Sequence, residues 1–168
     1  AAVVLADRLG GVTRLAWERL YTGSEADYYH AGALSGGGAL LRARTGPTDY
    51  HLYYQRVASP GPGSSFGSWQ DLGEVAAFSG LALAARASTV LLFYVGLNQR
   101  NVMVRESTDD GVTFGSGQFI FDPGVGTNWL AADYSSGGVP ALFFTAGSTL
   151  WWTKRSGGVW STPQAWPY

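Results

Sequence analysis

The chain contains an internal repeat in which an aromatic residue is followed by any residue, Ser or Thr, any residue, and Gln. The three copies begin at Phe66, Phe114 and Trp160, so they lie 48 and then 46 residues apart. A repeat of about 40 to 50 residues is typical of folds that stack one supersecondary unit against the next. The period therefore limits the chain to a small set of repeat architectures.

Three further segments precede the motif in each unit. Next to the motif is an alternating segment, whose period of two is typical of a half-buried strand. Before it comes an apolar run expected for a strand buried on both faces, and Leu40, Leu91 and Leu142 lie in these runs at spacings of 51 residues. The first segment is rich in Ala and Gly, which fit where strands crowd together. In chain order, the three segments are 31–34, 39–41 and 52–56 in the first unit, 81–85, 90–94 and 102–106 in the second, and 130–132, 141–144 and 150–154 in the third.

Four antiparallel strands in each unit, with the smallest residues in the first strand, predict an all-β chain of β-propeller blades. We expect full blades over 28–72, 79–121 and 127–167, within a single propeller region that spans 1–168. The ring would be partial, or completed by a second copy of the chain in a homo-oligomer or by upstream propeller sequence, because open sheet edges invite pairing.

The N-terminal segment is expected to supply half a blade. Residues 8–12 resemble 155–159, so we expect 1–22 to form the third and fourth strands of a blade. An amphipathic helix over Leu15–Leu20 is the alternative interpretation. Because the chain begins at Ala1 rather than at a Met, we expect the numbering to begin inside a longer gene product.

One turn between a third and a fourth strand carries a family resemblance. Ser107, Asp109, Gly111 and Thr113 match the Ser-x-Asp-x-Gly-x-Thr-Trp pattern, with Phe114 in place of the tryptophan. This segment resembles the Asp-box, or BNR repeat, of sialidase-like propellers. In such a turn the Asp side chain accepts backbone N–H groups and the Gly takes a positive φ, so we expect a structural role for these five residues.

The resemblance also implies which catalytic residues an enzyme of this kind would carry. Sialidase-like enzymes use three arginines, a Tyr–Glu nucleophile pair and an acid/base Asp, and these motifs are not matched here residue by residue. Arg86 and Asp133 lie near the ends of first strands but make no complete site. Kelch repeats match less well, because the Gly-Gly pairs follow the first strands. We therefore predict no catalytic residue in this chain.

Composition excludes several classes of function. The net charge is −1, with one lysine and ten scattered arginines, so nucleic acid is not an expected partner. There is no cysteine and no apolar run of about 18 residues, so neither disulfides nor a membrane-spanning helix is expected. His30 and His51 lack a recognisable second ligand, and the glycines at 36–38 lack the Lys of a phosphate loop, so we expect no metal and no cofactor.

The connections expected at one end of the blades are rich in aromatic, amide and charged side chains. Apolar sugar faces stack on aromatic rings while sugar hydroxyls need paired polar groups, so this composition suits a carbohydrate ligand. The alternative is that these aromatic residues only pack at the blade ends. The predicted ligand-binding residues are Asp27, Tyr29, His30, Asp49, Tyr50, Gln99, Arg100, Asn128 and Trp129.

The leading hypothesis is a non-catalytic glycan-binding or adhesion propeller that is secreted or displayed on a virion or cell surface. One alternative is part of a sialidase-like glycoside hydrolase or lyase whose catalytic blades lie elsewhere. Another is a structural protein for assembly or decoration of a larger particle.

Overall fold

The computed structural model describes residues 3–9, 12–18, 30–61 and 64–166. All regular structure in these ranges is β-strand, and they include no helix with the length and apolarity needed to cross a membrane. The strands are β1 (Val3–Leu9), β2 (Val12–Glu18), β3 (His30–Leu34), β4 (Leu40–Thr45), β5 (His51–Val57), β6 (Gln70–Arg86), β7 (Thr89–Gly96), β8 (Val102–Ser107), β9 (Gln118–Phe121), β10 (Thr127–Tyr134), β11 (Pro140–Ala146), β12 (Thr149–Ser156), β13 (Val159–Trp160) and β14 (Gln164–Ala165).

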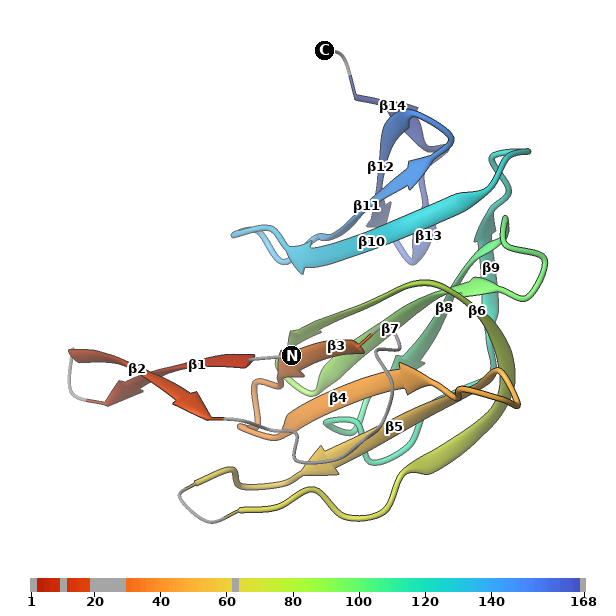
Figure 1. The fold of residues 1–168 in the computed structure, drawn as a ribbon. Helices are drawn as coiled ribbons and strands as arrows, with labels where there is room; N and C mark the ends of the chain where they lie inside the picture. The colour runs from red at the N-terminus through yellow and green to blue at the C-terminus, as the bar shows by residue number, and fades with distance from the viewer. Residues whose placement is uncertain (1–2, 10–11, 19–29, 62–63, 167–168) are drawn as a thin grey trace.

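Three propeller blades of four antiparallel strands stand side by side (Figure 1). Blade 1 comprises β3, β4, β5 and the first half of β6, and blade 2 comprises the second half of β6 with β7, β8 and β9. Blade 3 comprises β10, β11, β12 and β14, with β13 paired to the end of β12. Among the innermost strands, β6 contacts both β3 and β10. The predicted all-β propeller architecture is therefore present, whereas the predicted limits of the blades stay predictions.

The strand β7 shows why a blade in the middle of the array needs a continuous apolar run. Successive side chains of a strand point to opposite faces. Val90, Leu92 and Tyr94 therefore face blade 1, whereas Leu91 and Phe93 face blade 3, and all five are fully buried. Each boundary between blades thus has its own apolar cluster, and β7 contributes to both.

The repeat motif marks equivalent positions in the three blades, whereas the leucine spacing does not. The glutamine of each motif copy is the first residue of an outermost strand: Gln70 in β6, Gln118 in β9 and Gln164 in β14. The spacing of 51 residues, in contrast, does not mark equivalent positions, because Leu91 and Leu142 lie in the same cluster and face each other from adjacent blades.

The connections from the first to the second strand repeat over 100 residues. In blade 1 the Ser35 Oγ accepts the Ala39 N–H at 3.0 Å, and in blade 3 the Ser135 Oγ accepts the Val139 N–H at 3.1 Å. Gly138 in the second of these turns has a φ of 79°, in the left-handed region that favours glycine. The Gly-Gly pairs noted in the sequence are therefore turn residues of blades 1 and 3.

The N-terminal strands β1 and β2 form a separate antiparallel two-stranded sheet that extends away from the blades in Figure 1. Residues 15–18, where a helix was the alternative interpretation, belong to β2, and residues 19–20 lie outside the described residues. The assignment of 1–22 to half a blade stays a prediction.

Candidate functional site

The loop face is the end of the blades formed by the β4–β5, β7–β8 and β9–β10 connections, residues 46–50, 97–101 and 122–126. In the first two connections a short side chain accepts a backbone N–H two residues further on. The Asp49 Oδ1 accepts from His51 and the Asn98 Oδ1 accepts from Arg100, both at 3.0 Å. Asp49 is thus part of the turn itself.

Each of these turns places a side chain on strained backbone. Tyr50 and Gln99 have φ values of 61° and 60°, a region that non-glycine residues rarely adopt. Their carbonyls accept the N–H groups of Ala76 and Thr127, both at 2.8 Å, which tie each turn to the first strand of the next blade. Such strain is retained where the surroundings hold it, and it clusters at functional sites.

Trp129 is held outward by an irregularity in β10. The pairing of β10 with β11 shifts register between Asn128 and Leu130, so Trp129 is the extra residue of a β-bulge. Bulges re-aim side chains, and 67% of Trp129 is exposed to solvent. Gly80 of β6 lies against the backbone at this bulge, where a side chain on Gly80 would crowd Leu130.

An ion pair borders the bulge. The Arg100 guanidinium contacts Asp122 through two hydrogen bonds, from Nη2 at 2.6 Å and from Nε at 3.1 Å. The Thr127 hydroxyl donates to the Arg100 carbonyl at 2.8 Å, so the turn that carries Gln99 and Arg100 is fixed beside the start of β10. The structure therefore brings the turn with Gln99 and Arg100 to the start of β10, two residues before the bulged tryptophan.

The blade 1 part of the loop face carries a second polar cluster. The His51 Nδ1 lies 2.7 Å from the Asp71 Oδ2, and the Tyr53 hydroxyl donates to the Asp49 Oδ2 at 2.6 Å. The hydrogen bond with Asp71 raises the pKa of His51, and the same bond lowers the pKa of Asp71. The hydrogen bond that the Tyr53 hydroxyl donates to Asp49 raises the pKa of Tyr53 to about 12.

The pairing of His51 with Asp71 predicts a specific pH dependence. Because the folded state binds the His51 proton more tightly than the unfolded chain does, the pair stabilises the fold below about pH 6.5, and the contribution is lost as the pH rises through the raised pKa. We expect an NMR titration of the imidazole, assigned by His51→Gln, to give a pKa above 6.5, and Asp71→Asn to return it towards that value. An unchanged His51 titration in Asp71→Asn would contradict the pairing.

Three predicted ligand-binding residues remain to be placed. Asp27 and Tyr29 lie outside the described residues, and His30 begins β3. The sequence did not indicate Asp122, which lies in a loop-face segment, or Asp71, which lies in β6 opposite Tyr53. The ion pairs that hold them join residues 22 and 20 positions apart. In the part of the chain that the structure describes, no three His, Cys, Asp or Glu side chains group as metal ligands.

The turn over Ser107–Phe114 lies at the opposite end of blade 2. The Asp109 carboxylate accepts the Thr113 N–H at 2.9 Å, the Thr113 hydroxyl at 2.7 Å and the Ser107 hydroxyl at 2.7 Å. These hydrogen bonds, that of the Thr113 N–H first, lower the pKa of Asp109 to about 2. The Phe114 ring meets Tyr54 of blade 1 edge-on, with centroids 4.9 Å apart. All of these contacts fix the turn, and the hydrogen bonds within it occupy the Asp109 carboxylate.

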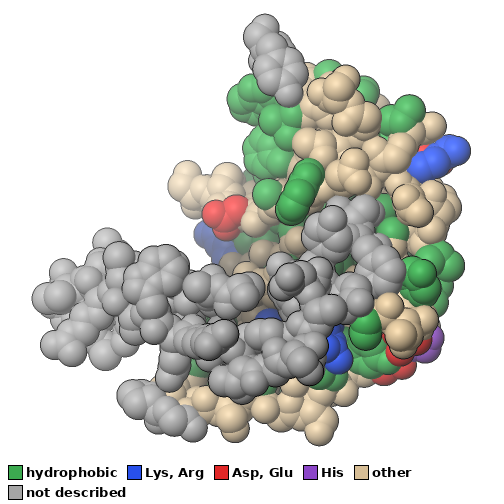
Figure 2. Space-filling view, in the orientation of Figure 1, with side chains coloured by type: hydrophobic (Ala, Val, Ile, Leu, Met, Phe, Trp, Pro, Cys, Tyr) green, Lys and Arg blue, Asp and Glu red, His purple; other side chains and the backbone are tan. Residues whose placement is uncertain are grey.

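Figure 2 shows how few charged side chains one face of the molecule carries and how hydrophobic side chains gather over blade 3. On the side of blade 3 that faces away from blade 2, Phe143 and Trp166 have ring centroids 5.9 Å apart. Trp151 and Trp160 pack against the cluster between blades 2 and 3. Trp166 is 46% exposed instead.

No model of a protein family matches the chain, and no curated protein matches it. Solved structures do. An α-L-arabinanase of Penicillium chrysogenum, solved with arabinobiose, has 12% sequence identity and a TM-score of 0.55, over 82% of this chain and 48% of that one. The α-L-arabinofuranosidase Arb93A of Fusarium graminearum has 13% identity and a TM-score of 0.57, over 98% of this chain and 52% of that one.

A third similar structure is a fucose lectin of Kordia zhangzhouensis in complex with methyl-fucoside. It has 11% identity and a TM-score of 0.52, over 83% of this chain and 98% of that one. The chain thus spans about half the length of the arabinanase and arabinofuranosidase structures that it matches. Likeness at such low identity concerns the fold alone, and the fold of this chain is that of the β-propellers.

Proposed function

We propose that this chain is a carbohydrate-binding propeller that recognises a glycan at the loop face without cleaving it. The observation that carries the proposal is the bulge at Trp129, which leaves this residue 67% exposed directly after Asn128, while the Gln99 carbonyl accepts the Thr127 N–H at the start of the same strand. An indole offers a flat apolar surface to a sugar ring, and neighbouring amides can both donate to and accept from its hydroxyls. The glycosidases and the lectin of similar fold, each named for a saccharide, support this class of ligand.

The electrostatics of the loop face favour binding over hydrolysis. A glycosidase needs a carboxylic acid whose pKa is raised, so that it can protonate the leaving group. Hydrogen bonds from Tyr53, His51 and Arg100 instead lower the pKa of Asp49, Asp71 and Asp122 respectively. These carboxylates stay ionised and paired. The glycoside hydrolase or lyase alternative would therefore need carboxyl groups other than these three.

The finer family assignment and the setting are also proposals. The hydrogen bonds of Asp109 are those that an Asp-box turn requires, which supports a sialidase-like propeller with one intact box. An adhesion role, secreted or on a virion or cell surface, is the setting that we propose for glycan recognition. The apolar outer side of blade 3 supports homo-oligomer formation or a role in particle assembly. Light scattering, which gives the mass of the chain in solution, tests whether it self-associates.

Trp129→Ala is expected to weaken glycan binding about tenfold or more, because the stacking surface is lost while the bulged backbone remains. The first probes are arabinobiose and methyl-fucoside, followed by a glycan array, with titration calorimetry on the strongest ligand. Trp129→Phe should keep part of the affinity, since a smaller ring can still stack.

Phe119→Ala is the matched control for this experiment. Phe119 lies in β9, away from the bulge, and 58% of it is exposed, so its removal should leave the affinity unchanged. Equal losses in both variants, or none in either, would contradict the loop-face site. Release of arabinose or fucose during the titrations would favour the hydrolase alternative.

A further inference from the structure

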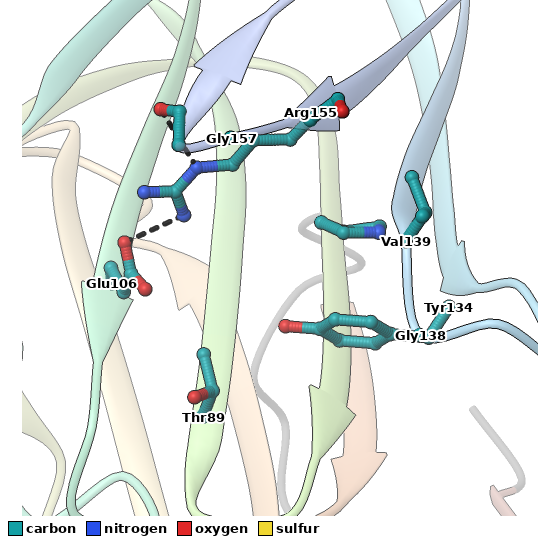
Figure 3. A pocket seen from close by; sticks show the side chains of 10 residues that line it. Thr89, Glu106, Tyr134, Gly138, Val139, Arg155 and Gly157 are labelled. Atoms are coloured by element: carbon teal, nitrogen blue, oxygen red, sulfur yellow. Dashed lines mark hydrogen bonds and ion pairs between the residues drawn. The ribbon is translucent and has the colours of Figure 1, made fainter.

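A cavity of about 350 Å³ lies between blades 2 and 3, at the end of the blades opposite the loop face (Figure 3). Thr89 at the start of β7 and Glu106 near the end of β8 line it from blade 2. Tyr134 at the end of β10 and Arg155 near the end of β12 line it from blade 3. The close-up shows the polar ends of these four side chains around one space.

Comparison with the other blade boundary explains why this space is open. Leu41 faces blade 2 and Leu91 faces blade 3, and they pair with Arg56 and Glu106 respectively, so Arg56 and Glu106 occupy equivalent positions. At the first boundary the turn of blade 2 fills the space: the Arg56 Nε donates to the Asp110 carbonyl at 2.8 Å.

The corresponding turn of blade 3 is shorter. It passes from Arg155 through Gly157 and Gly158 directly to β13, and these glycines have no side chain to insert. The Gly158 carbonyl accepts from the Arg155 Nε at 3.1 Å, which keeps the turn close to β12. The volume that the Asp109 turn occupies at the first boundary therefore stays open at the second.

The polar groups of the cavity have bonding capacity left after their contacts with each other. The Arg155 Nη1 donates to the Glu106 Oε2 at 2.7 Å, which leaves Nη2 and Oε1 outside the hydrogen bonds found among the described residues. Burial, and next Glu106, raise the pKa of Tyr134, so its hydroxyl stays a donor at neutral pH. Val139 and Pro140 add an apolar wall.

We propose that this inter-blade cavity is a second saccharide site, separate from the loop face, which takes one neutral sugar ring. The charges of Glu106 and Arg155 cancel, so the lining residues offer donors and acceptors without net charge of their own, and the Arg86 guanidinium lies beside Gly138 at the edge. Sugar hydroxyls need both, and the apolar wall suits the C–H face of a ring. The inference rests on the proposed function for the class of ligand but not for the place where it binds.

The test is an amide chemical-shift titration of the whole ¹⁵N-labelled chain with methyl-fucoside, methyl arabinofuranoside and methyl glucuronide. We expect saturable shifts at Thr89, Tyr134 and Ser156 with a neutral glycoside. Tyr134→Phe should weaken that binding about 3- to 10-fold, the effect of one lost hydrogen bond. Thr89→Val is a second variant that removes only a hydroxyl and should act in the same direction.

Tyr94→Phe is the matched control, because it removes a hydroxyl buried at the boundary between blades 1 and 2 and should leave the cavity shifts unchanged. Unchanged affinity in both Tyr134→Phe and Thr89→Val would overturn the site. Tighter binding of the glucuronide would overturn the assignment of the site to neutral sugars. The Arg86 guanidinium, which lies beside Gly138 at the cavity, is the charge that would attract a glucuronide carboxylate.

The two saccharide proposals fail separately. Shifts confined to Gln99, Asn128 and Trp129 would overturn the cavity site and leave the loop-face proposal in place. Shifts confined to the cavity residues would do the reverse. A chain that responds to none of the neutral glycosides would overturn both.

Discussion

Replacing Phe93 with alanine is expected to lower the free energy of unfolding by about 3–5 kcal/mol. The Phe93 ring is fully buried between blades 2 and 3 and meets Trp160 edge-on, with centroids 5.4 Å apart. Alanine would lose the transfer free energy of the ring and leave a cavity that flanking strands cannot close. Urea denaturation followed by circular dichroism and tryptophan fluorescence measures the change.

Phe119→Ala removes the same atoms from a position that is 58% exposed, and it should change the stability by no more than about 0.5 kcal/mol. Because the two variants differ only in burial, the difference between them isolates the packing of the blade boundary. Similar small losses in both would mean that blades 2 and 3 do not pack as described.

Gly111→Ala is expected to cost about 2–5 kcal/mol. Gly111 has a φ of 75°, where a side chain costs about 1–2 kcal/mol, and a Cβ there would overlap the Leu41 side chain of blade 1. Relieving such an overlap displaces packed atoms at a further cost of about 1–3 kcal/mol. Thermal and urea unfolding of the variant measure the sum.

A double-mutant cycle separates these two contributions. In the background of Leu41→Ala the overlap is gone, so Gly111→Ala should cost only about 1–2 kcal/mol for its backbone conformation. Gly67→Ala is the matched control, because a Cβ at Gly67 meets no atom within 4 Å and should be tolerated. A full cost in the Leu41→Ala background would show that the two residues do not touch.

The sequence predicted the blades well because the residues that build them are local. The motif glutamines begin the outermost strands, and the unbroken apolar run over 90–94 correctly indicated a strand buried on both faces. The spacing of 51 residues between leucines does not join equivalent positions. Successive side chains of a strand point to opposite faces, so a spacing that differs by one residue from the true repeat places a side chain on the other face. Leu91 and Leu142 consequently face each other.

The candidate site was less predictable because its contacts join residues far apart in the chain. The types of residue in the turns indicated a polar face with aromatic side chains, but not that Asp122 would hold Arg100 or that a bulge would expose Trp129. The short third turn is visible in the sequence. That it would leave a cavity between Glu106 and Arg155 depends on how two blades face each other, which no local pattern encodes.

The long strand β6 determines where this chain could gain or lose a blade. The backbone passes from blade 1 to blade 2 without leaving the strand, so a cut or an insertion at that boundary would interrupt hydrogen bonds to both β5 and β7. Between blades 2 and 3 the chain instead leaves the sheet over residues 122–126. Duplication, recombination or protein engineering can therefore treat blade 3 as an exchangeable unit, whereas blades 1 and 2 must be inherited together.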